Sequence, residues 1–290
     1  MRERLWKYGR RLLARWLMFM TVGAAVAEQP ATLLFASGFE ADVQVDPPKA
    51  RTLSGADRTS GYRWPADLPG AHDRAYFNYL VSRDKALSEF VETRIETVPG
   101  PHGTPTRALY INVLKLDRDF KGTTRVQYNM FPGGESAADR LQQMYVRYWL
   151  KLQPNLPDVL TWRLIMEWLN GDYRWGVYIY RDKNDKTKPY WHVKGQYLKK
   201  PGRPNHWQVS NKDVPVPLDT WFKFEVFWVH SAGPDGRVWV AIDGQTICDY
   251  KGPNKVRNGI GAWCIFKNYG SIGSGQWIDD LALYDRIPGR

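Results

Sequence analysis

The chain has 290 residues, of which 41 are Lys or Arg and 30 are Asp or Glu, so its formal net charge is +11. Six of the basic residues and one Glu lie within the first 27 residues, so the net charge of residues 28–290 falls to +6. This excess is spread along the chain rather than clustered, which argues against nucleic-acid binding. It favours an anionic partner such as an acidic polysaccharide.

The first residues are typical of an export signal. A basic stretch ending at Arg15 precedes an apolar run from Leu17 to Ala27, which closes with the A-x-A cleavage pattern Ala25-Val26-Ala27. The apolar run is shorter than the roughly 20 residues that span a bilayer. An amphipathic helix packed on the domain is the alternative. We expect a signal peptide over residues 1–27, no stable membrane anchor after its cleavage, and a secreted or periplasmic protein.

The rest of the chain has the period-two pattern of strands. Apolar and polar side chains alternate in the segments Tyr145–Leu152, Trp221–His230 and Val238–Ile242. Asp243-Gly244 then predicts a tight hairpin turn, because both positions accept positive φ. Many short strands with closely spaced turns indicate a sandwich or barrel.

Few segments favour helix. Only Ser82–Glu92 and Ser136–Gln142 look able to form short helices, and the Pro-, Arg- and Gly-rich stretch Pro47–Gly70 reads as an irregular loop. We therefore predict that residues 28–290 form a single all-β domain, a two-sheet antiparallel sandwich, which we expect to be a monomer.

The two ends of the predicted domain carry carboxylates. Residues Phe35–Glu40 predict the first strand and Trp277–Tyr284 the last, and such terminal strands often lie side by side in a sandwich. Glu40, Asp279 and Asp280 would then supply the hard oxygen ligands of a structural Ca²⁺ ion. Solvated carboxylates at strand ends are the alternative.

Two cysteines follow the predicted cleavage site. Cys248 and Cys264 could form a disulfide in an oxidising compartment, or remain two buried free thiols on neighbouring strands. The sequence leaves both possibilities open.

Several short motifs in the second half carry a family resemblance. They are Trp191-His192-Val193-Lys194, Val214-Pro215-Val216-Pro217, Trp221-Phe222-Lys223-Phe224-Glu225-Val226, Gly233-Pro234-Asp235-Gly236-Arg237-Val238-Trp239, Ile242-Asp243-Gly244-Gln245 and Gln276-Trp277-Ile278-Asp279-Asp280-Leu281. Together they resemble the heparin lyase I-like polysaccharide lyases, a branch of the concanavalin A-like lectin/glucanase superfamily, over roughly residues 28–290. The resemblance implies a β-jelly roll whose concave sheet holds an extended sugar chain.

The resemblance does not extend to the family's Gln-x-His pair. Lyases of this type generally carry that pair on a central concave strand, here the segment Trp162–Asn170. At the corresponding place this chain reads Glu167-Trp168-Leu169. No catalytic residue is therefore carried over from the family, and the candidate site comes from the residues themselves.

Alternation places polar and aromatic side chains together on three central strands. We expect one shared face to carry Arg163 and Glu167, then Arg174, Tyr178 and Tyr180, then Tyr190, His192, Lys194 and Gln196. As substrate-binding residues the sequence suggests Glu167, Arg174, Gln196, Trp168 and Tyr197.

Such a face suits β-elimination of a uronic-acid polymer, which requires no cofactor. The reaction needs a group that neutralises the uronate carboxylate, a base and an acid. Arg163 or Lys194 would neutralise the carboxylate. His192 would be the base, and Tyr178 or Tyr180 would be the acid. The alternatives are a hydrogen-bonded sheet residue for His192 and an ion pair on a solvated face for Arg163 with Glu167.

Other functions stay open. A non-catalytic carbohydrate-binding sandwich of the cell envelope would use the same exposed aromatic rings to stack on sugars. An interaction protein that binds no glycan is a third class. Glycoside hydrolysis is less favoured, because Glu167 has no second carboxylate on its strand face.

Overall fold

The structure is a computed structural model in which the predicted signal peptide lies outside the described residues. Described are residues 30–46, 51–69, 75–120, 123–130, 141–169, 172–185, 187–255 and 262–289. The strands all belong to one compact unit, Ala31–Arg290. Within the described residues no helix is long and apolar enough to cross a membrane.

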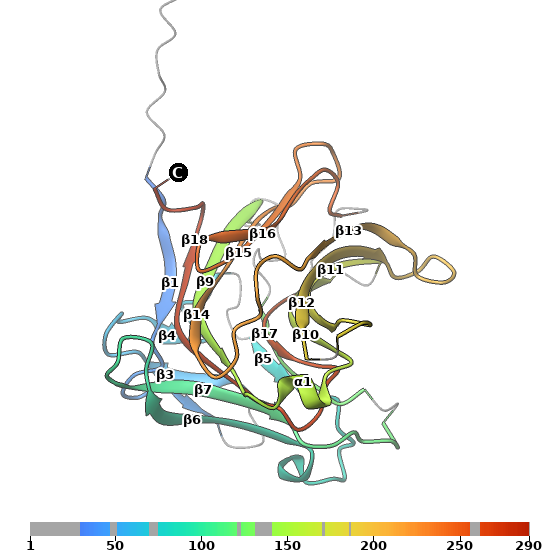
Figure 1. Ribbon diagram of the computed structural model, residues 1–290. Coiled ribbons are helices and arrows are strands. Elements are labelled where there is room, and N and C mark those ends of the chain that lie inside the picture. Colours follow the sequence, from blue (N-terminus) through green and yellow to red (C-terminus); the bar gives the residue numbers. More distant parts are fainter. Residues whose placement is uncertain are drawn as a thin grey trace, which may run out of the picture. The chain divides into compact units, whose positions relative to one another are not determined.

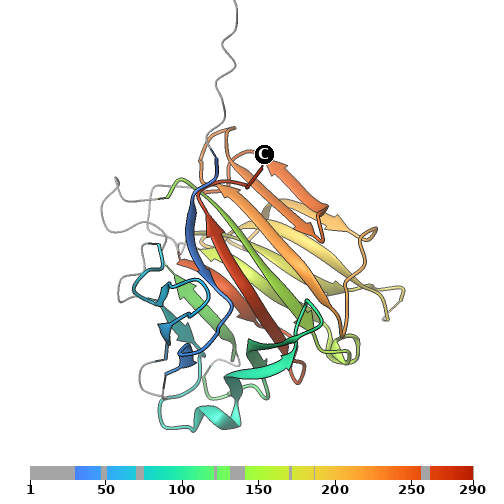
Figure 2. The same cartoon turned by 90° about the vertical axis from the view of Figure 1, so that its left-hand side faces the viewer.

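The domain is an all-β sandwich of two large antiparallel sheets, as the alternation predicts (Figure 1). The eight-stranded sheet has, in spatial order, β16 (Gln245–Lys251), β15 (Arg237–Ile242), β14 (Trp221–Val229), β9 (Gln143–Leu152), β18 (Gln276–Tyr284), β7 (Pro105–Val113) and β6 (Val91–Pro99), with β1 (Leu33–Ser37) paired to β18. Figure 2 shows β1, β18, β9 and β14 side by side in this sheet.

The second sheet has seven strands and carries the predicted polar face. Its order is β13 (Asn205–Asn211), β12 (Pro189–Tyr197), β11 (Tyr173–Arg181), β10 (Trp162–Leu169), β17 (Ala262–Asn268), β8 (Val126–Met130) and β5 (Tyr76–Asn78). Sequence neighbours β10 to β13 lie side by side, so their alternating faces form one continuous surface.

The core lies between the two sheets and is unusually rich in Trp. Trp168 of β10 packs against Trp228 of β14 with ring centroids 5.7 Å apart, and Trp191 of β12 meets Phe222 of β14 at 6.1 Å. All four side chains are almost fully buried. The inner faces of the sheets are thus apolar, and the polar side chains of β10 to β13 face outward, away from the eight-stranded sheet.

The predicted pairing of the chain's two end strands is confirmed. β1 runs antiparallel to β18, with Phe35 opposite Leu283 and Ser37 opposite Leu281. The predicted hairpin at Asp243-Gly244 joins β15 to β16, and both residues have positive φ, 49° and 78°. Glycine relieves the steric cost at the second of these positions.

The loop and helix predictions are only partly right. The stretch 47–70 contains two short strands of a small three-stranded sheet, formed by β2 (Gln44–Val45), β3 (Leu53–Ala56) and β4 (Arg63–Trp64). The segment 82–92 forms only a 3-10 turn, Leu87–Glu89, before β6 begins at Val91. Most of the helix expected at 136–142 lies outside the described residues. The one described α-helix, α1 (Leu156–Val159), was not predicted.

The two cysteines are free and buried. Cys248 lies on β16 in the eight-stranded sheet and Cys264 on β17 in the other sheet. The disulfide that the sequence left open is not formed, and the alternative of two buried free thiols is confirmed, except that their strands are not neighbours. Local sequence could not show that the two strands belong to different sheets.

Candidate functional site

Polar side chains line up across β10, β11, β12 and β13 on the outward face of the seven-stranded sheet. Antiparallel register places Tyr178 opposite His192, and His192 opposite Ser210. In the neighbouring row Glu167 lies opposite Gly176, which in turn lies opposite Lys194. Four strands therefore bring a carboxylate, an imidazole, an ammonium and two phenols onto one surface, here called the polar face.

The centre of the polar face consists of three neighbouring titratable side chains, His192, Tyr180 and Lys194. The Lys194 ammonium donates to the Tyr180 hydroxyl at 3.2 Å and lies 4.9 Å from the centroid of the Tyr178 ring. The rings of Tyr180 and His192 are 4.9 Å apart and nearly perpendicular. His192 Nδ1 lies 2.8 Å from the Ser210 hydroxyl, which orients the imidazole.

Burial and charge keep His192 neutral. Burial, and secondarily the charge of Lys194, lower the pKa of His192 to about 4. Burial also lowers the pKa of Lys194, and the nearby Arg174 guanidinium adds to this effect. The neutral imidazole keeps a ring nitrogen with a free lone pair, so His192 can act as a base, although burial and the charge of Lys194 make it a weak one.

The two tyrosines differ in accessibility. Tyr178 is only 3% exposed, and its hydroxyl has no hydrogen-bond partner among the described residues. Tyr180 is half-buried and accepts the hydrogen bond from Lys194. Burial raises the pKa of both phenols, so both keep their proton at neutral pH. Tyr180 is therefore the better placed of the two to meet a ligand.

A buried ion network lies beside this centre. The Glu167 carboxylate contacts the ammonium of Lys267 through Oε2, and Arg174 Nη1 lies 3.4 Å from Glu167 Oε1. Arg174 also donates twice to Gln196 Oε1, at 2.6 and 2.9 Å. Gln196 in turn donates to the Arg203 carbonyl at 2.7 Å. The chain of bonds holds Glu167, Arg174 and Gln196 in fixed positions on the polar face.

The carboxylate at the centre of this network stays ionised. Burial alone would raise the pKa of Glu167, but the charges of Lys267 and Arg174 outweigh it and lower that pKa. Both Glu167 and Lys267 are nearly inaccessible, at 2% and 1% exposed. The pair is thus a buried, permanently charged support beneath the polar face rather than a proton donor.

Sequence reasoning missed Lys267 and its neighbours on β17. A β-bulge between Cys264 and Phe266 shifts the register, so Cys264 and Lys267 lie on the polar face although they are three residues apart. Cys264 donates to Asn129 Oδ1 of β8 at 3.1 Å. The only sign of Lys267 in the sequence was a lysine after an apolar run. Without the pairing to β8 and β10, that sign does not show on which face of the sheet the side chain lies.

The structure corrects the placement of Arg163. A β-bulge between Leu164 and Met166 reverses the alternation, so Arg163 lies opposite Ile179 rather than on the face of Glu167. The side chain is fully buried and donates to the Ser274 carbonyl at 2.8 Å. Burial lowers the pKa of Arg163 to about 9. Arg163 ties β10 to the loop before β18 and does not reach the polar face.

Two predicted substrate-binding residues also face away. Trp168 lies opposite Trp175 and Trp263 and packs in the core. Tyr197 lies opposite the buried Tyr173 and packs against the same core, one position beyond Gln196 on the strand. Both follow the period-two rule, because neighbours of polar-face residues must point inward.

The three carboxylates proposed for a metal come together where β1 meets β18. Thr106 donates to Glu40 Oε1 at 3.2 Å and to Asp279 Oδ2 at 2.9 Å. Burial, reinforced by the nearby charges of Asp280 and Glu40, raises the pKa of Asp279 to about 7. In the described part of the chain no three His, Cys, Asp or Glu side chains are arranged to hold a metal ion. The Ca²⁺ site therefore stays a prediction.

Comparisons with known proteins give weak likenesses. No family model and no curated protein matches the sequence. Among solved structures, the chain is similar to the alginate lyase Aly36B, with 14% identity, 69% of this chain and 84% of that chain covered, and a TM-score of 0.47.

The chain is also similar to two further solved structures. The endo-β-1,4-glucuronan lyase from the fungus Trichoderma reesei has 12% identity, 72% and 94% coverage and a TM-score of 0.44. The receptor binding domain of botulinum neurotoxin type G has 11% identity, covers 89% of this chain and 48% of that one, and has a TM-score of 0.41. Two of these three neighbours are polysaccharide lyases and the third is the receptor binding domain of a toxin.

Proposed function

We propose that this protein is a polysaccharide lyase-like enzyme, secreted or periplasmic, that cleaves an anionic uronate glycan by β-elimination on the polar face. The observation that carries the proposal is the grouping of Lys194, Tyr180 and the neutral His192. Among the described residues the Lys194 ammonium has no carboxylate within ion-pair distance, and its hydrogen bond goes to the Tyr180 hydroxyl. An unpaired cation beside a base and a phenol is what a carboxylated sugar would need.

Lys194 is the residue that would neutralise the uronate carboxylate, because Arg163 lies in the interior. A uronate carboxylate placed at the Lys194 ammonium would lose much of its negative charge to the ion pair. The hydrogen on the adjacent carbon then becomes more acidic. Arg174 is less suited to this role, since Glu167 and Gln196 already occupy its guanidinium.

The proton transfers balance as follows. His192 Nε2 takes the proton from the carbon next to the carboxylate, and the electron pair left behind forms the new carbon–carbon double bond. The glycosidic C–O bond on the neighbouring carbon breaks, and Tyr180 gives its proton to the leaving oxygen. Proton exchange with water then returns His192 to the neutral form and Tyr180 to the phenol. No cofactor takes part.

Arg174 and Gln196 are proposed to line the path of the glycan, and the buried Glu167 to hold Arg174 in position. The donors of Arg174 and Gln196 that remain after their internal bonds would bind sugar hydroxyls or further carboxylates. Because the buried Lys267 fixes Glu167, these groups are held before the ligand arrives, which lowers the entropic cost of binding.

The direct test is product formation. Purified protein is incubated with alginate, polyglucuronate and hyaluronan, with amylose as the neutral control, and the ultraviolet absorbance of the unsaturated product is followed. We expect absorbance to rise with at least one uronate polymer and not with amylose. Lys194→Gln should lower the rate about a hundredfold or more. If no anionic glycan gives absorbance, the lyase proposal is wrong.

A matched variant separates the role of Lys194 from general charge. Lys212 is also a basic residue next to a tyrosine ring, 5.2 Å from the centroid of Tyr190, but it pairs with Asp182. Lys212→Gln should change the rate by less than about threefold, because Lys212 is exposed and already paired with Asp182. Equal losses in the two variants would point to net charge instead of a specific ion pair.

The alternative function is a carbohydrate-binding sandwich without catalysis. One observation favours it: a base with a pKa of about 4 accepts a proton weakly at neutral pH. In that case affinity electrophoresis in alginate would show retardation that Lys194→Gln abolishes, while product absorbance stays absent.

A further inference from the structure

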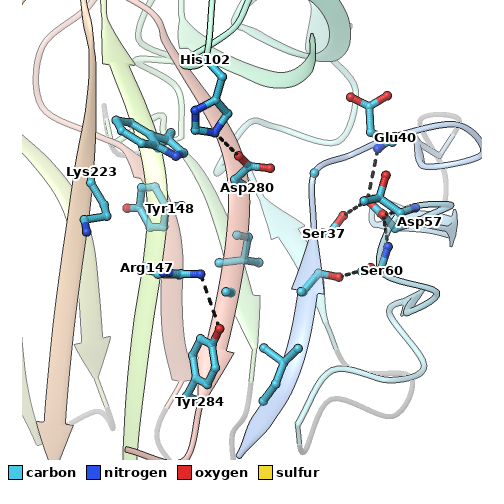
Figure 3. Close-up of a pocket in the computed structure, with 17 residues that line it drawn as sticks. Ser37, Glu40, Asp57, Ser60, His102, Arg147, Tyr148, Lys223, Asp280 and Tyr284 are labelled. Atoms are coloured by element: carbon cyan, nitrogen blue, oxygen red, sulfur yellow. Dashed lines mark hydrogen bonds and ion pairs between the residues drawn. The ribbon is translucent and has the colours of Figure 1, made fainter. Parts of the chain in front are cut away.

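A cavity lies on the opposite side of the sandwich from the polar face, on the outward face of the eight-stranded sheet (Figure 3). Its volume is about 540 Å³, within the range of small-ligand sites. β9, β14 and β18 line it, together with β1, the following loop with Glu40, the turn of Asp57 and Ser60, and the tip of the β6–β7 hairpin. None of its lining residues belongs to the polar face, so it is separate from the proposed lyase site.

Arg147 gives the cavity a cation that forms no ion pair with any carboxylate among the described residues. In register Arg147 lies directly opposite Glu225. The Glu225 carboxylate instead accepts a 2.5 Å hydrogen bond from Tyr145, and Arg147 forms no ion pair with any described residue. Its guanidinium reaches Tyr284, with a separation of 3.5 Å between Nη2 and the hydroxyl (Figure 3).

Lys223 adds a second cation to the same wall. It lies opposite Trp149 on the neighbouring strand and is therefore a diagonal neighbour of Arg147, a relation in which long side chains can act on one ligand. Its ammonium is 3.8 Å from the Glu225 carboxylate, a long and partly exposed pair. Two basic groups thus border one side of the cavity.

An aromatic ring and a hairpin form another wall. Trp149 lies two residues from Arg147 on β9, so the two side chains share the outward face. The ring of His102, at the tip of the β6–β7 hairpin, is perpendicular to the Trp149 ring with 5.5 Å between centroids. His102 Nε2 also lies 3.3 Å from Asp280 Oδ2, so the hairpin is held against the sheet.

A β-bulge turns an acidic side chain into the cavity. Between Asp279 and Ala282 the register of β18 against β9 shifts, and Asp280 has a φ of +48°. Bulges of this kind re-aim side chains and are frequent next to binding sites. The Asp280 side chain is 48% exposed, and Figure 3 shows it between Arg147 and His102. Glu40 and Asp57 line the same side, where internal hydrogen bonds engage their carboxylates. The cavity therefore has cations on one side and carboxylate acceptors on the other.

We propose that this cavity is a second, non-catalytic binding site for one acidic sugar residue of a glycan. The sugar carboxylate would bind Arg147 and Lys223, its hydroxyls would donate to Asp280, and the apolar face of its ring would lie on Trp149. An aromatic wall fits a pyranose ring better than a small zwitterion. This inference does not depend on the lyase proposal, because it uses neither the same residues nor the same sheet.

The probe is D-glucuronic acid, which has no glycosidic bond to cleave. Full-length ¹⁵N-labelled protein is titrated with it, and the indole N–H signal of Trp149, assigned with Trp149→Phe, is followed by NMR. We expect saturable shifts of that signal with D-glucuronic acid and much weaker ones with D-glucose. Arg147→Gln should weaken the affinity about tenfold or more, the effect of losing one charge-assisted contact.

Lys151→Gln is the matched control. Lys151 lies on the same strand and the same face as Arg147, but it pairs with Asp219 and does not line the cavity. Its replacement should change the affinity by less than about twofold. A Trp149 signal that does not move, or equal losses in both variants, would overturn the proposal. Stronger shifts with glycine than with D-glucuronic acid would also overturn it, in favour of a zwitterion site.

The two proposed sites can fail independently. Arg147→Gln should leave product absorbance on uronate polymers unchanged, whereas Lys194→Gln should leave the Trp149 titration unchanged. Loss of Trp149 shifts in Lys194→Gln would show that the signal reports the polar face, which would contradict a second site. Shifts that persist in a protein without lyase activity would support the second site alone.

Discussion

The ammonium of Lys194 passes over the ring of Tyr178 to reach the hydroxyl of Tyr180. It lies 4.9 Å from the Tyr178 ring centroid and 3.2 Å from the Tyr180 oxygen. The register places Lys194 opposite Gly176, whose missing side chain leaves room beside Tyr178. An added Cβ at Gly176 would come within 3.1 Å of the Tyr178 ring. Lys194 thus packs over the ring of Tyr178 and hydrogen-bonds to the hydroxyl of Tyr180.

This relationship predicts different roles for the two phenols. Tyr180→Phe should lower kcat/KM on a uronate polymer about a hundredfold or more, because it removes the proposed general acid but keeps the ring. Tyr178→Phe should keep activity within about threefold, since the hydroxyl it removes is buried and bonds to no described residue. Initial rates of product absorbance for the two variants provide the measurement. The reverse order of effects would assign the acid to Tyr178.

The depressed pKa of His192 predicts a specific pH dependence of stability. The unfolded chain protonates this residue below its ordinary value of 6.5, whereas the folded protein does so only near 4. The stabilisation from keeping His192 neutral is therefore complete above about pH 6.5 and is lost as the pH falls toward about 4. The wild type should lose more stability than His192→Gln between about pH 7 and about pH 4.5 in urea unfolding. Equal losses would contradict the depressed pKa, as would an NMR titration of His192 near 6.5.

The buried pair of Glu167 and Lys267 predicts a large effect of removing one partner. Glu167→Gln leaves the Lys267 ammonium, only 1% exposed, without its carboxylate, and should lower the free energy of unfolding by about 3–5 kcal/mol. The double variant Glu167→Gln with Lys267→Met should recover most of that loss, because the buried ammonium is removed and the remaining cation of the network, Arg174, keeps its hydrogen bonds to Gln196. Urea denaturation of the single and double variants measures both.

The control for this pair is an exposed one. Glu89 pairs with Lys115 at 3.0 Å, and both side chains are more than half exposed. Glu89→Gln should cost less than about 1 kcal/mol. A similar small cost for Glu167→Gln would mean that Lys267 finds water or another partner in solution.

The raised pKa of Asp279 predicts that the protein loses stability toward alkaline pH. The folded protein holds a proton on Asp279 up to about pH 7, well above the ordinary value of 3.8. The resulting stabilisation is complete below about pH 4 and is lost as the pH rises through about 7. Asp279→Asn cannot ionise, so its Tm should fall less than that of the wild type between about pH 5 and about pH 8. Parallel Tm curves would exclude a buried, protonated Asp279.

The Ca²⁺ site predicted from the sequence would use the same carboxylates. A bound cation would offset the repulsion among Glu40, Asp279 and Asp280, so added CaCl₂ should raise the Tm, and more at about pH 8 than at about pH 5. Asp280→Asn should reduce the shift. Asp249→Asn, in an exposed pair with Arg237, should not. An unchanged Tm over millimolar Ca²⁺ would remove the metal site from consideration.

The sequence by itself determined the all-β sandwich and much of the polar face. Alternation is a local property, so the sequence of a strand such as β9 or β14 predicts which of its residues face inward, whatever its partner strands are. On the uninterrupted strands β11 and β12, the predicted face of Tyr178, Tyr180, His192, Lys194 and Gln196 agrees with the observed one.

The positions of the β-bulges and the grouping of distant segments depend on the tertiary structure, and alternation does not predict them. One extra residue in a strand reverses every side chain beyond it, and the pairing with a neighbouring strand determines where it is inserted. The bulge in β10 therefore sent Arg163 into the interior, and the bulge in β17 brought Lys267 to the polar face. The cavity around Arg147 and Trp149 likewise joins β1, β9, β14, β18 and a hairpin tip from distant parts of the chain. No local pattern could place these segments together, because their contacts form only when the sheets assemble.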